Sequence, residues 1–242
     1  MPSGKLSEGK TKIIEPTQDP DQVILYFKDD VTGGDGAKHD VLVGKGRVNA
    51  AISVRLLRLL EENGIKTHLI KQTGPTQLIA RKLKMIPLEV VCRILAAGHL
   101  VGIGKYFQHR QRLNPPIVEF YMKDDSLHDP MLNRYHIRAL GLATDQEISE
   151  MENVTLQTAN VLEKFLAERG MLLADFKLEF GRDREGKLIV GDELSTDSMR
   201  LWDKSSFEIL DKDRFRKDMP QIMELAYLEP LRRICGENSV PR

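Results

Sequence analysis

Apolar residues recur every three or four positions in two long segments of the 242-residue chain, which is the spacing of a helix with one buried face. The first segment ends at Asn63-Gly64, a pair that commonly terminates a helix. The second begins at Thr144 with Glu147 three residues later, a capping-box arrangement. We therefore predict two amphipathic helices. Their inward positions are Val48, Ala51, Ile52, Leu56, Leu59 and Leu60 in the first, and Ile148, Met151, Val154, Thr158, Val161, Leu162, Phe165 and Leu166 in the second.

Shorter runs of apolar and β-branched residues predict strands around these helices. Residues 5–28 indicate two strands joined by the turn PTQDPD, residues 65–70 indicate another, and residues 85–96 indicate a buried strand. The breakers NPP, KDD and HDP make residues 114–142 a predicted loop region, and a final helix is interrupted by Pro230. Because the strands come in antiparallel pairs beside helices, we predict an α+β fold rather than a doubly wound parallel sheet.

The segment DFKLEFGRDREGKLIVGDELS, which starts at Asp175, predicts a hairpin with one charged face. Its first strand alternates charged residues with large apolar ones, so the two kinds lie on opposite faces. If DREG forms the turn, paired residue numbers sum to 369, which places Lys177 opposite Asp192 and Glu179 opposite Val190. The polar face then gathers Asp175, Lys177, Glu179 and Asp192.

In this register Glu179 and Asp192 are diagonal neighbours whose carboxylates can converge on one hard cation. Two carboxylates suit Mg²⁺, which keeps some of its waters and takes its other ligands from phosphate oxygens. The alternative is a solvated hairpin in which Lys177 merely neutralises the acids beside it.

Two other segments carry charges that suit anions. In GKTK, Lys10 and Lys12 alternate on one face with Thr11 between them, so ammonium and amide groups can lie along a polyphosphate. On these residues alone, an ordinary exposed strand is the better interpretation. Arg93 lies in the apolar segment that ends in AAG, and a buried arginine needs either an anionic ligand or a buried carboxylate. His99 could donate to that anion or cap a helix.

The composition narrows the class of protein. Lysine and arginine number 36, as do aspartate and glutamate, so no general affinity for polyanions is indicated and nucleic acid is not an expected partner. Cys92 and Cys235 lie far apart and no histidines join them at zinc-ligand spacing, which argues against a disulfide scaffold and a structural zinc. No segment approaches the roughly 20 apolar residues of a membrane span, so we expect a soluble, cytoplasmic protein without a membrane partner.

Taken together, these segments resemble one family, phosphoribosylaminoimidazole-succinocarboxamide synthase, also called SAICAR synthetase. The similarity runs in order along nearly the whole chain. The matching motifs are GKTKII, GDGAK, KGRVNA, IPLEVVCR with AAG, LHDPM, LADFKLEFG, VGDELSTDSMRLWDK and DKDRFR. LADFKLEFG fits the family signature at every position, whereas MIPLEVVCRILAAGH fits another signature except at its end.

The resemblance implies an N-terminal antiparallel lobe, residues 1–86, similar to the small lobe of a kinase, and a larger α+β lobe, residues 87–242. ATP would lie in the cleft between them, with Mg²⁺. The implied reaction joins L-aspartate to the carboxylate of 5-amino-1-(5-phosphoribosyl)imidazole-4-carboxylate through an acyl phosphate, a step of de novo purine biosynthesis.

The resemblance also assigns roles to residues at matching positions. For the nucleotide and metal, Lys10, Thr11 and Lys12 would contact ATP phosphates, Met85 the adenine region and Lys123 the nucleotide, while Glu179 and Asp192 would hold Mg²⁺. For the ribonucleotide, the residues are Arg93, His99, Asp175 and Arg200. Two of the polar-face residues are predicted to be catalytic: Lys177 would steady the acyl-phosphate oxygens, and Asp175 would orient the substrate's amino group.

The chain departs from the family pattern at Ile94, Leu95 and His99, where Asn after the arginine and Ser or Ala after AAG are usual, and at Thr196, where proline is usual. Two alternatives therefore stay open. One is a paralogue that performs the same ligation on a different azole carboxylate or amine, and the other is a non-catalytic nucleotide-binding protein. An exposed helix stripe could also serve a homodimer.

Overall fold

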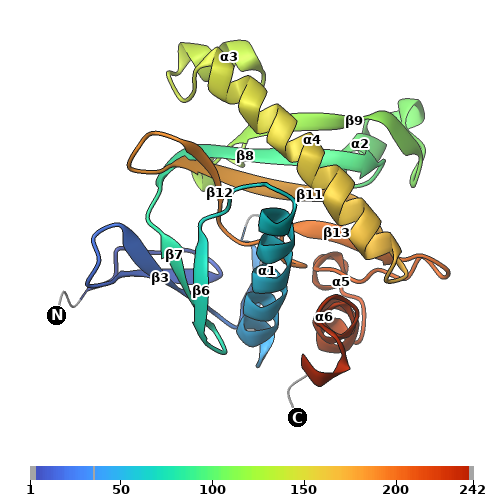
Figure 1. Ribbon diagram of the computed structural model, residues 1–242. Helices are drawn as coiled ribbons and strands as arrows, with labels where there is room; N and C mark the ends of the chain where they lie inside the picture. The colour runs from blue at the N-terminus through green and yellow to red at the C-terminus, as the bar shows by residue number, and fades with distance from the viewer. Residues whose placement is uncertain (1–3, 35, 240–242) are drawn as a thin grey trace.

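Two antiparallel sheets form the scaffold of the computed structural model, which describes residues 4–34 and 36–239 (Figure 1). The first sheet has the strand order β1-β2-β3-β7-β6. Its strands are β1 (Ser7–Glu8), β2 (Lys12–Pro16), β3 (Gln22–Phe27), β6 (Leu69–Gly74) and β7 (Gln77–Arg81). A separate two-stranded ribbon follows β3 and consists of β4 (Asp30–Gly33) and β5 (Lys38–Val41). Asp35, within the GDGAK motif, lies outside the described residues.

The second sheet has the order β10-β9-β8-β11-β12, and β13 pairs with β11 as well. Its strands are β8 (Lys84–Leu95), β9 (Arg112–Met122), β10 (Met131–Leu132), β11 (Met171–Arg182), β12 (Leu188–Gly191) and β13 (Met199–Asp203). The long strand β11 is therefore central, with β8 along one edge and β12 and β13 in succession along the other. A parallel bridge between Thr67 and Val190 links the chain entering β6 to β12 of the second sheet.

Helices cover the second sheet and fill the space beside the first. The α-helices are α1 (Lys45–Glu62), α2 (His99–Gly102), α3 (Arg134–Ala139), α4 (Asp145–Ala167), α5 (Asp213–Arg216) and α6 (Glu229–Cys235). Short 3₁₀ turns occur at Gly104–Tyr106, Asp125–Leu127 and Glu237–Ser239, and a π-helix occupies Ile222–Leu228. Figure 1 shows α4 lying across the sheet face formed by β8, β9 and β11, with α1 between β6 and α6.

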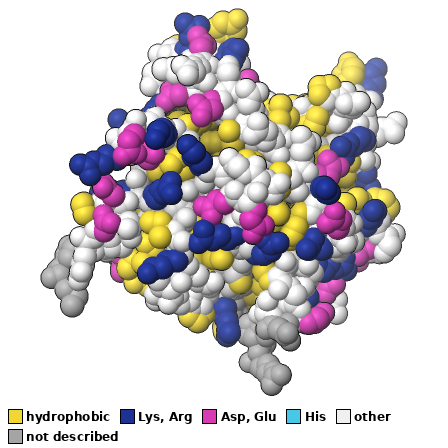
Figure 2. Space-filling model, viewed as in Figure 1, with side chains coloured by type: hydrophobic (Ala, Val, Ile, Leu, Met, Phe, Trp, Pro, Cys, Tyr) yellow, Lys and Arg dark blue, Asp and Glu magenta, His cyan; other side chains and the backbone are white. Residues whose placement is uncertain are grey.

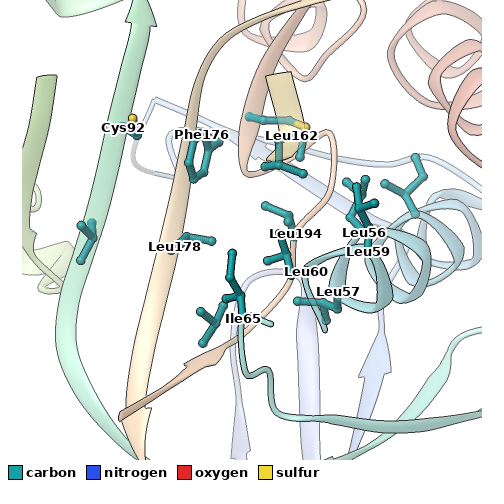
Figure 3. Close-up of a cluster of buried hydrophobic side chains, with 14 of the residues drawn as sticks. Leu56, Leu57, Leu59, Leu60, Ile65, Cys92, Leu162, Phe176, Leu178 and Leu194 are labelled. Carbon is teal, nitrogen blue, oxygen red and sulfur yellow. The ribbon is translucent and has the colours of Figure 1, made fainter. Parts of the chain in front are cut away.

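The largest hydrophobic core lies between α1, α4 and the inner face of β11. Figure 3 shows leucines of α1 facing Phe176 and Leu178 of β11, with Leu162 of α4 above them. These side chains are almost completely buried, and burial of each contributes about 1.5–3 kcal/mol. A Cβ on Gly46 would lie 2.4 Å from the carbonyl oxygen of Phe27, so glycine lets the start of α1 lie directly against the end of β3.

The structure confirms an α+β fold with antiparallel sheets, both amphipathic helices and the buried strand at residues 85–96. Thr144 and Glu147 form the predicted capping box at the start of α4. The final helix also has an interruption near Pro230, where the π-helix gives way to α6.

The prediction that residues 114–142 are mainly loop is wrong, because β9 is an 11-residue strand. Pro115 and Pro116 argued against a strand, since proline cannot donate to a ladder. The structure tolerates them because they lie in the part of β9 that β10 does not cover, so one side of this segment is an edge. The β-rich run IVEFYM, residues 117–122, was the signal for this strand.

The predicted hairpin register is wrong by one residue. Glu179 pairs with Gly191 and Arg182 with Leu188, so the turn contains five residues rather than four. The additional residue is accommodated because Asp183 caps the turn: its side chain accepts a hydrogen bond from the Lys187 amide at 2.8 Å. Strand β12 then ends at Gly191, and Asp192 takes a left-handed φ of 62°, which turns its side chain out of the ladder.

The exposed charges are mixed in sign over the face drawn in Figure 2, where Lys and Arg side chains alternate with Asp and Glu. That distribution agrees with the equal numbers of basic and acidic residues. None of the helices in the described part of the chain combines the length and apolar character that crossing a membrane requires.

The ion pair between Glu147 and Arg182 ties the start of α4 to the end of β11 and should make folding sensitive to acid. Hydrogen bonding from Arg182 lowers the pKa of Glu147 to about 2 from an ordinary 4.5, with a smaller contribution from Thr144. A lowered pKa stabilises the fold at pH values above the unfolded pKa, and that stability is lost as the pH falls towards the folded pKa.

We therefore expect Glu147→Gln to lower the free energy of unfolding near pH 7, and the difference from the wild type to shrink between about pH 4.5 and pH 2. Urea denaturation across this pH range measures the difference. A constant difference at all pH values would show that Glu147 acts through neutral capping alone.

Candidate active site

Two adjoining cavities lie along the polar face of β11. The larger, about 690 Å³, is lined by residues from β1, β2, the β4–β5 ribbon and the second sheet, so it lies between the two sheets. The smaller, about 380 Å³, is bounded by β8, β9, β11 and β13. We call them the inter-sheet cavity and the sheet-face cavity. The residues that line both are Glu89, Asp129, Lys177, Asp197, Ser198 and Arg216.

The inter-sheet cavity contains lysines that carboxylates already neutralise. Lys12 Nζ lies 2.6 Å from both Asp192 Oδ1 and Glu193 Oε1. Lys123 Nζ contacts both carboxylate oxygens of Glu179, at 2.7 and 2.6 Å. These pairs join residues distant in sequence, because β2, the end of β9 and the β11–β12 hairpin meet around the cavity.

Lys10 and Lys177 are also paired with carboxylates. The Lys10 ammonium donates to Asp125 at 2.7 Å. Lys177 forms an ion pair with Glu89 on β8 and lies 3.6 Å from Glu179 Oε1. The arrangement holds each ammonium group at a fixed position on the cavity wall, where an anion can exchange for the carboxylate.

Glu179 and Asp192 remain close enough to repel each other despite the register error. Burial raises the pKa of Glu179, and the charge of Asp192 raises it further. Burial alone would also raise the pKa of Asp192, but Lys12, Lys123 and Lys177 outweigh it and lower that pKa. The left-handed conformation of Asp192 brings about this proximity, which the predicted extended register had attributed to diagonal pairing.

A row of opposite charges crosses the sheet at the floor of the sheet-face cavity. The ladder pairs Asp175 with Arg93 on β8 and with Arg200 on β13. Arg93 Nη1 and Arg200 Nη1 both donate to Asp175 Oδ2, at 3.2 and 2.7 Å. Asp175 thus holds the two arginines on either side of its carboxylate.

Arg93 is also bound to a buried carboxylate, which is one of the two partners that the sequence predicted for a buried arginine. Its Nε donates to Glu119 Oε2 at 2.6 Å, and Tyr121 donates to the same oxygen at 2.8 Å. Its Nη2 lies 2.9 Å from Nδ1 of His99, at the start of α2. Burial and the charge of Arg93 lower the pKa of His99, so this histidine is neutral near pH 7 and can accept from Arg93.

The predicted site residues fall into three groups. The inter-sheet cavity brings together Lys10, Thr11, Lys12, Lys123, Lys177, Glu179 and Asp192. The sheet-face cavity brings together Arg93, His99, Asp175, Lys177 and Arg200. Met85 is separate: it lines neither cavity and packs over Gly181 and Gly191, where a Cβ would lie about 3.0–3.1 Å from its Sδ or Cε.

Sequence reasoning missed several residues on the shared wall. Glu89 lies four residues before Arg93 on β8. Because side chains two or four residues apart share one face of a strand, this spacing was the signal that placed Glu89 beside Arg93. Asp197 had no comparable signal, because its partners come from distant helices. Lys45 Nζ lies 2.8 Å from its Oδ2, and Tyr227 donates to its Oδ1 at 2.8 Å.

The described residues contain no group of three or more His, Cys, Asp and Glu side chains arranged to hold a metal ion.

The fold and these cavities define a class: an α+β protein with a charged ligand cleft between two antiparallel sheets. The comparison with known proteins is more specific. The SAICAR synthetase family profile matches residues 5–234, so the chain belongs to the SAICAR synthetase family.

Individual relatives agree with this assignment. The phosphoribosylaminoimidazole-succinocarboxamide synthase of Methanocaldococcus jannaschii is 49% identical over 219 residues, covering 90% of this chain and 89% of that protein. A solved SAICAR synthetase in complex with ADP has a TM-score of 0.93 and 45% identity, covering 98% of this chain and 99% of that one. The synthase from Ehrlichia chaffeensis has a TM-score of 0.93 at 37% identity, covering 99% and 100%.

Gly98, the glycine of the AAG turn, lies against Arg200. A Cβ at this position would lie 2.9 Å from Arg200 Nη2, and the backbone has a φ of +56°. Arg200 cannot easily move, because Asp175 and Asp213 hold it from two sides. The small-residue turn thus accommodates a protein guanidinium.

We expect Gly98→Ala to lower the free energy of unfolding by about 1–3 kcal/mol beyond the cost of its positive φ. Gly104→Ala is the matched control, since Gly104 has a φ of +79° and nothing within 4 Å of its added Cβ. Urea denaturation should show the excess cost at Gly98 disappearing when Arg200→Ala is also present. An excess that persists in the double variant would contradict the assigned contact.

Proposed function

We propose that the chain catalyses the ATP-dependent joining of L-aspartate to the carboxylate of 5-amino-1-(5-phosphoribosyl)imidazole-4-carboxylate, giving SAICAR for purine biosynthesis. One structural observation carries the proposal beyond family membership. Lys177 lies on the wall shared by two cavities, one suited to a polyphosphate and the other to an azole carboxylate. A reaction that transfers a phosphoryl group from one ligand to the other needs such a boundary.

The nucleotide would occupy the inter-sheet cavity, between a β-rich N-terminal lobe, residues 1–86, and the C-terminal lobe, residues 87–242. Lys10, Thr11 and Lys12 would bind its phosphates from the first sheet, and Lys123 would bind from the second. The adenine would extend beyond the inter-sheet cavity to Met85, which lines neither cavity and is 40% exposed where β8 begins. The solved relative in complex with ADP supports the use of a nucleotide.

Formal charges favour a divalent cation with the nucleotide. Among the described residues, eight carboxylates and six basic side chains line the inter-sheet cavity, an excess of two negative charges. A triphosphate carries further negative charge, so it cannot enter favourably without cations. Glu179 and Asp192 fit Mg²⁺ because both carboxylates line the cavity and the charge of Asp192 raises the pKa of Glu179, an effect that a cation between them would oppose. When bound, Mg²⁺ would neutralise charge on the phosphate oxygens.

The azole ribonucleotide would occupy the sheet-face cavity. Arg93, Arg200 and His99 supply donors for its anionic groups, and Asp175 between the arginines can accept from its amino group. Carboxylates already hold Arg93 and Arg200 in position for the ligand. The same carboxylates neutralise part of the positive charge of the two arginines.

The chemistry needs activation because a carboxylate is a poor acceptor for an amine. A carboxylate oxygen of the azole attacks the γ-phosphorus, the bond to ADP breaks, and an acyl phosphate forms. The aspartate amine then attacks the acyl carbon, the carbon–oxygen bond to phosphate breaks, and the nitrogen loses a proton. Lys177 would stabilise negative charge on the transferred phosphoryl group, where positioning and electrostatics supply most of the acceleration.

A coupled ADP-release assay tests the proposal directly. ADP should form only when the azole carboxylate, L-aspartate and Mg·ATP are all present, and SAICAR should appear in equal amount. A panel of other azole carboxylates and amines distinguishes a paralogue. Tight ATP binding with no turnover for any pair would favour the non-catalytic alternative.

We expect Glu179→Gln and Asp192→Asn each to lower kcat at least about a hundredfold, the usual effect of removing an electrostatic contact to a reacting phosphoryl group. Folding should persist, because Lys12 keeps Glu193 and Lys177 keeps Glu89 as partners. The concentration of Mg²⁺ needed for half-maximal rate should also rise. Glu185→Gln, in the exposed turn of the same hairpin, is the control and should leave both quantities unchanged; full activity in either test variant contradicts the metal assignment.

A further inference from the structure

His68 is a buried histidine that lies beside Asp192 without lining either cavity. It directly precedes β6 and is only 5% exposed. Its ring donates a hydrogen bond to the backbone carbonyl of Asp192. Nε2 of the ring is buried without a hydrogen-bond partner among the described residues, so Nδ1 is the donor. A buried nitrogen without a partner costs stability, and packing alone therefore does not account for a histidine here.

Two hydrogen bonds from His68 hold the chain on both sides of Gly191. The His68 amide donates to the Val190 carbonyl at 2.9 Å, within the parallel bridge between Thr67 and Val190. The ring reaches the carbonyl two residues further on, at Asp192. At this point β12 has ended and Asp192 takes its left-handed φ of 62°. A residue other than glycine keeps such a conformation only when its surroundings fix it, and His68 supplies that constraint.

The His68 ring is an uncharged donor. Burial lowers the pKa of His68 to about 4, while the charge of Asp192 raises this pKa and the charge of Lys12 lowers it. The ring is therefore neutral near pH 7. A neutral ring can hold the backbone of Asp192 without adding positive charge that would repel a divalent cation.

Lys12 also holds Asp192, but through a contact that a ligand would disrupt. Its Nζ lies 2.6 Å from Asp192 Oδ1, and Lys12 lines the inter-sheet cavity. A polyphosphate bound there would draw the ammonium group away from the carboxylate. The bond from His68 goes to the backbone from outside the cavity, so the same ligand leaves it in place. His68 would thus keep the carboxylate in position when the nucleotide brings its metal.

We propose that His68 is a positioning residue for Asp192: its ring fixes the left-handed backbone of Asp192 and so holds the carboxylate where a divalent cation binds. The inference rests on the proposed function, in which Asp192 and Glu179 hold Mg²⁺. His68 belongs to the first sheet, because the Arg81 amide of β7 donates to its carbonyl at 2.7 Å. The sheet that would bind the nucleotide phosphates therefore also orients a metal-binding carboxylate of the second sheet.

Calorimetric titration with ADP, with and without a fixed excess of Mg²⁺, tests the inference in the absence of turnover. Mg²⁺ should tighten the binding of ADP to the wild type. His68→Leu should lower that enhancement about tenfold, the usual effect of removing a group that orients a metal ligand. The affinity for ADP without metal should not change, since Lys10, Thr11 and Lys12 remain. In the ligation assay, the Mg²⁺ concentration for half-maximal rate should rise, whereas the KM for the azole ribonucleotide should stay the same.

Two further substitutions identify the ring nitrogen responsible. The side-chain amide introduced by His68→Asn reaches the position of Nδ1, so this variant should recover most of the response to Mg²⁺. The longer side chain of His68→Gln carries its amide towards the position of Nε2 and should not recover it. Equal responses from these two variants would contradict the inference. If urea denaturation shows that His68→Leu does not fold, this comparison decides the question.

Thr67→Val is the matched control, because Thr67 is buried next to His68 and its hydroxyl donates to Glu61 at 2.7 Å, away from the site. This variant should respond to Mg²⁺ as the wild type does. A loss equal to that of His68→Leu would show that the segment acts through packing alone and would overturn the proposal, as would a normal response in His68→Leu. A wild type whose affinity for ADP does not respond to Mg²⁺ would instead reject the metal assignment in the proposed function.

Discussion

Strand β11 buries charge on one face at the centre of a sheet, and the rest of the site depends on how that charge is compensated. An isolated ion in the interior is strongly unfavourable, so each one must find a partner. Asp175 is bound by two arginines, Lys177 by Glu89, and Glu179 by Lys123. These partners come from β8, β13 and the end of β9, and within the hairpin Lys177 also lies 3.6 Å from Glu179. The polar face therefore becomes ordered only when the second sheet and its connections are assembled.

The compensating charges extend into a continuous chain across the sheet-face cavity. Arg200 donates to Asp175 and also to Asp213, at 3.0 Å through Nε, so it joins β11 to the start of α5. Removing one member would leave its neighbours with an unbalanced buried charge, which costs more than the pair itself contributes. In order, the members are Glu119, Arg93, Asp175, Arg200, Asp213 and Arg216. The chain fixes the position of Arg216 relative to the sheet-face cavity.

Sequence patterns correctly predicted the features that depend on interactions between residues close together in the chain. The alternation along β11 identified the charged face, and the capping box located the start of α4, because both signals act within a few residues. The predicted register of the hairpin was wrong because the side chain of Asp183 caps the turn and lengthens it by one residue. The sequence did not predict strand β9, because its prolines are tolerated only at a sheet edge. That edge exists only once the strands of the sheet are assembled.

The partners of the site residues were less predictable, because they depend on which strands lie side by side. Neither the pairing of β8 with β11 nor the return of β2 to the hairpin has a local signal. The family resemblance supplied the residues of the site but not the partners that the structure gives them.

The paired lysines and carboxylates of the inter-sheet cavity impose a coupling between anion and cation binding. An anion that binds Lys12 and Lys123 takes these ammonium groups from Asp192 and Glu179. The two carboxylates then lose part of the positive charge beside them, and the repulsion between them increases. A divalent cation relieves that repulsion, and by linkage each ligand must raise the affinity for the other by the same factor. With the proposed ligands bound, the salt bridges of Lys12 and Lys123 to Asp192 and Glu179 would be exchanged for contacts to a polyphosphate and its metal.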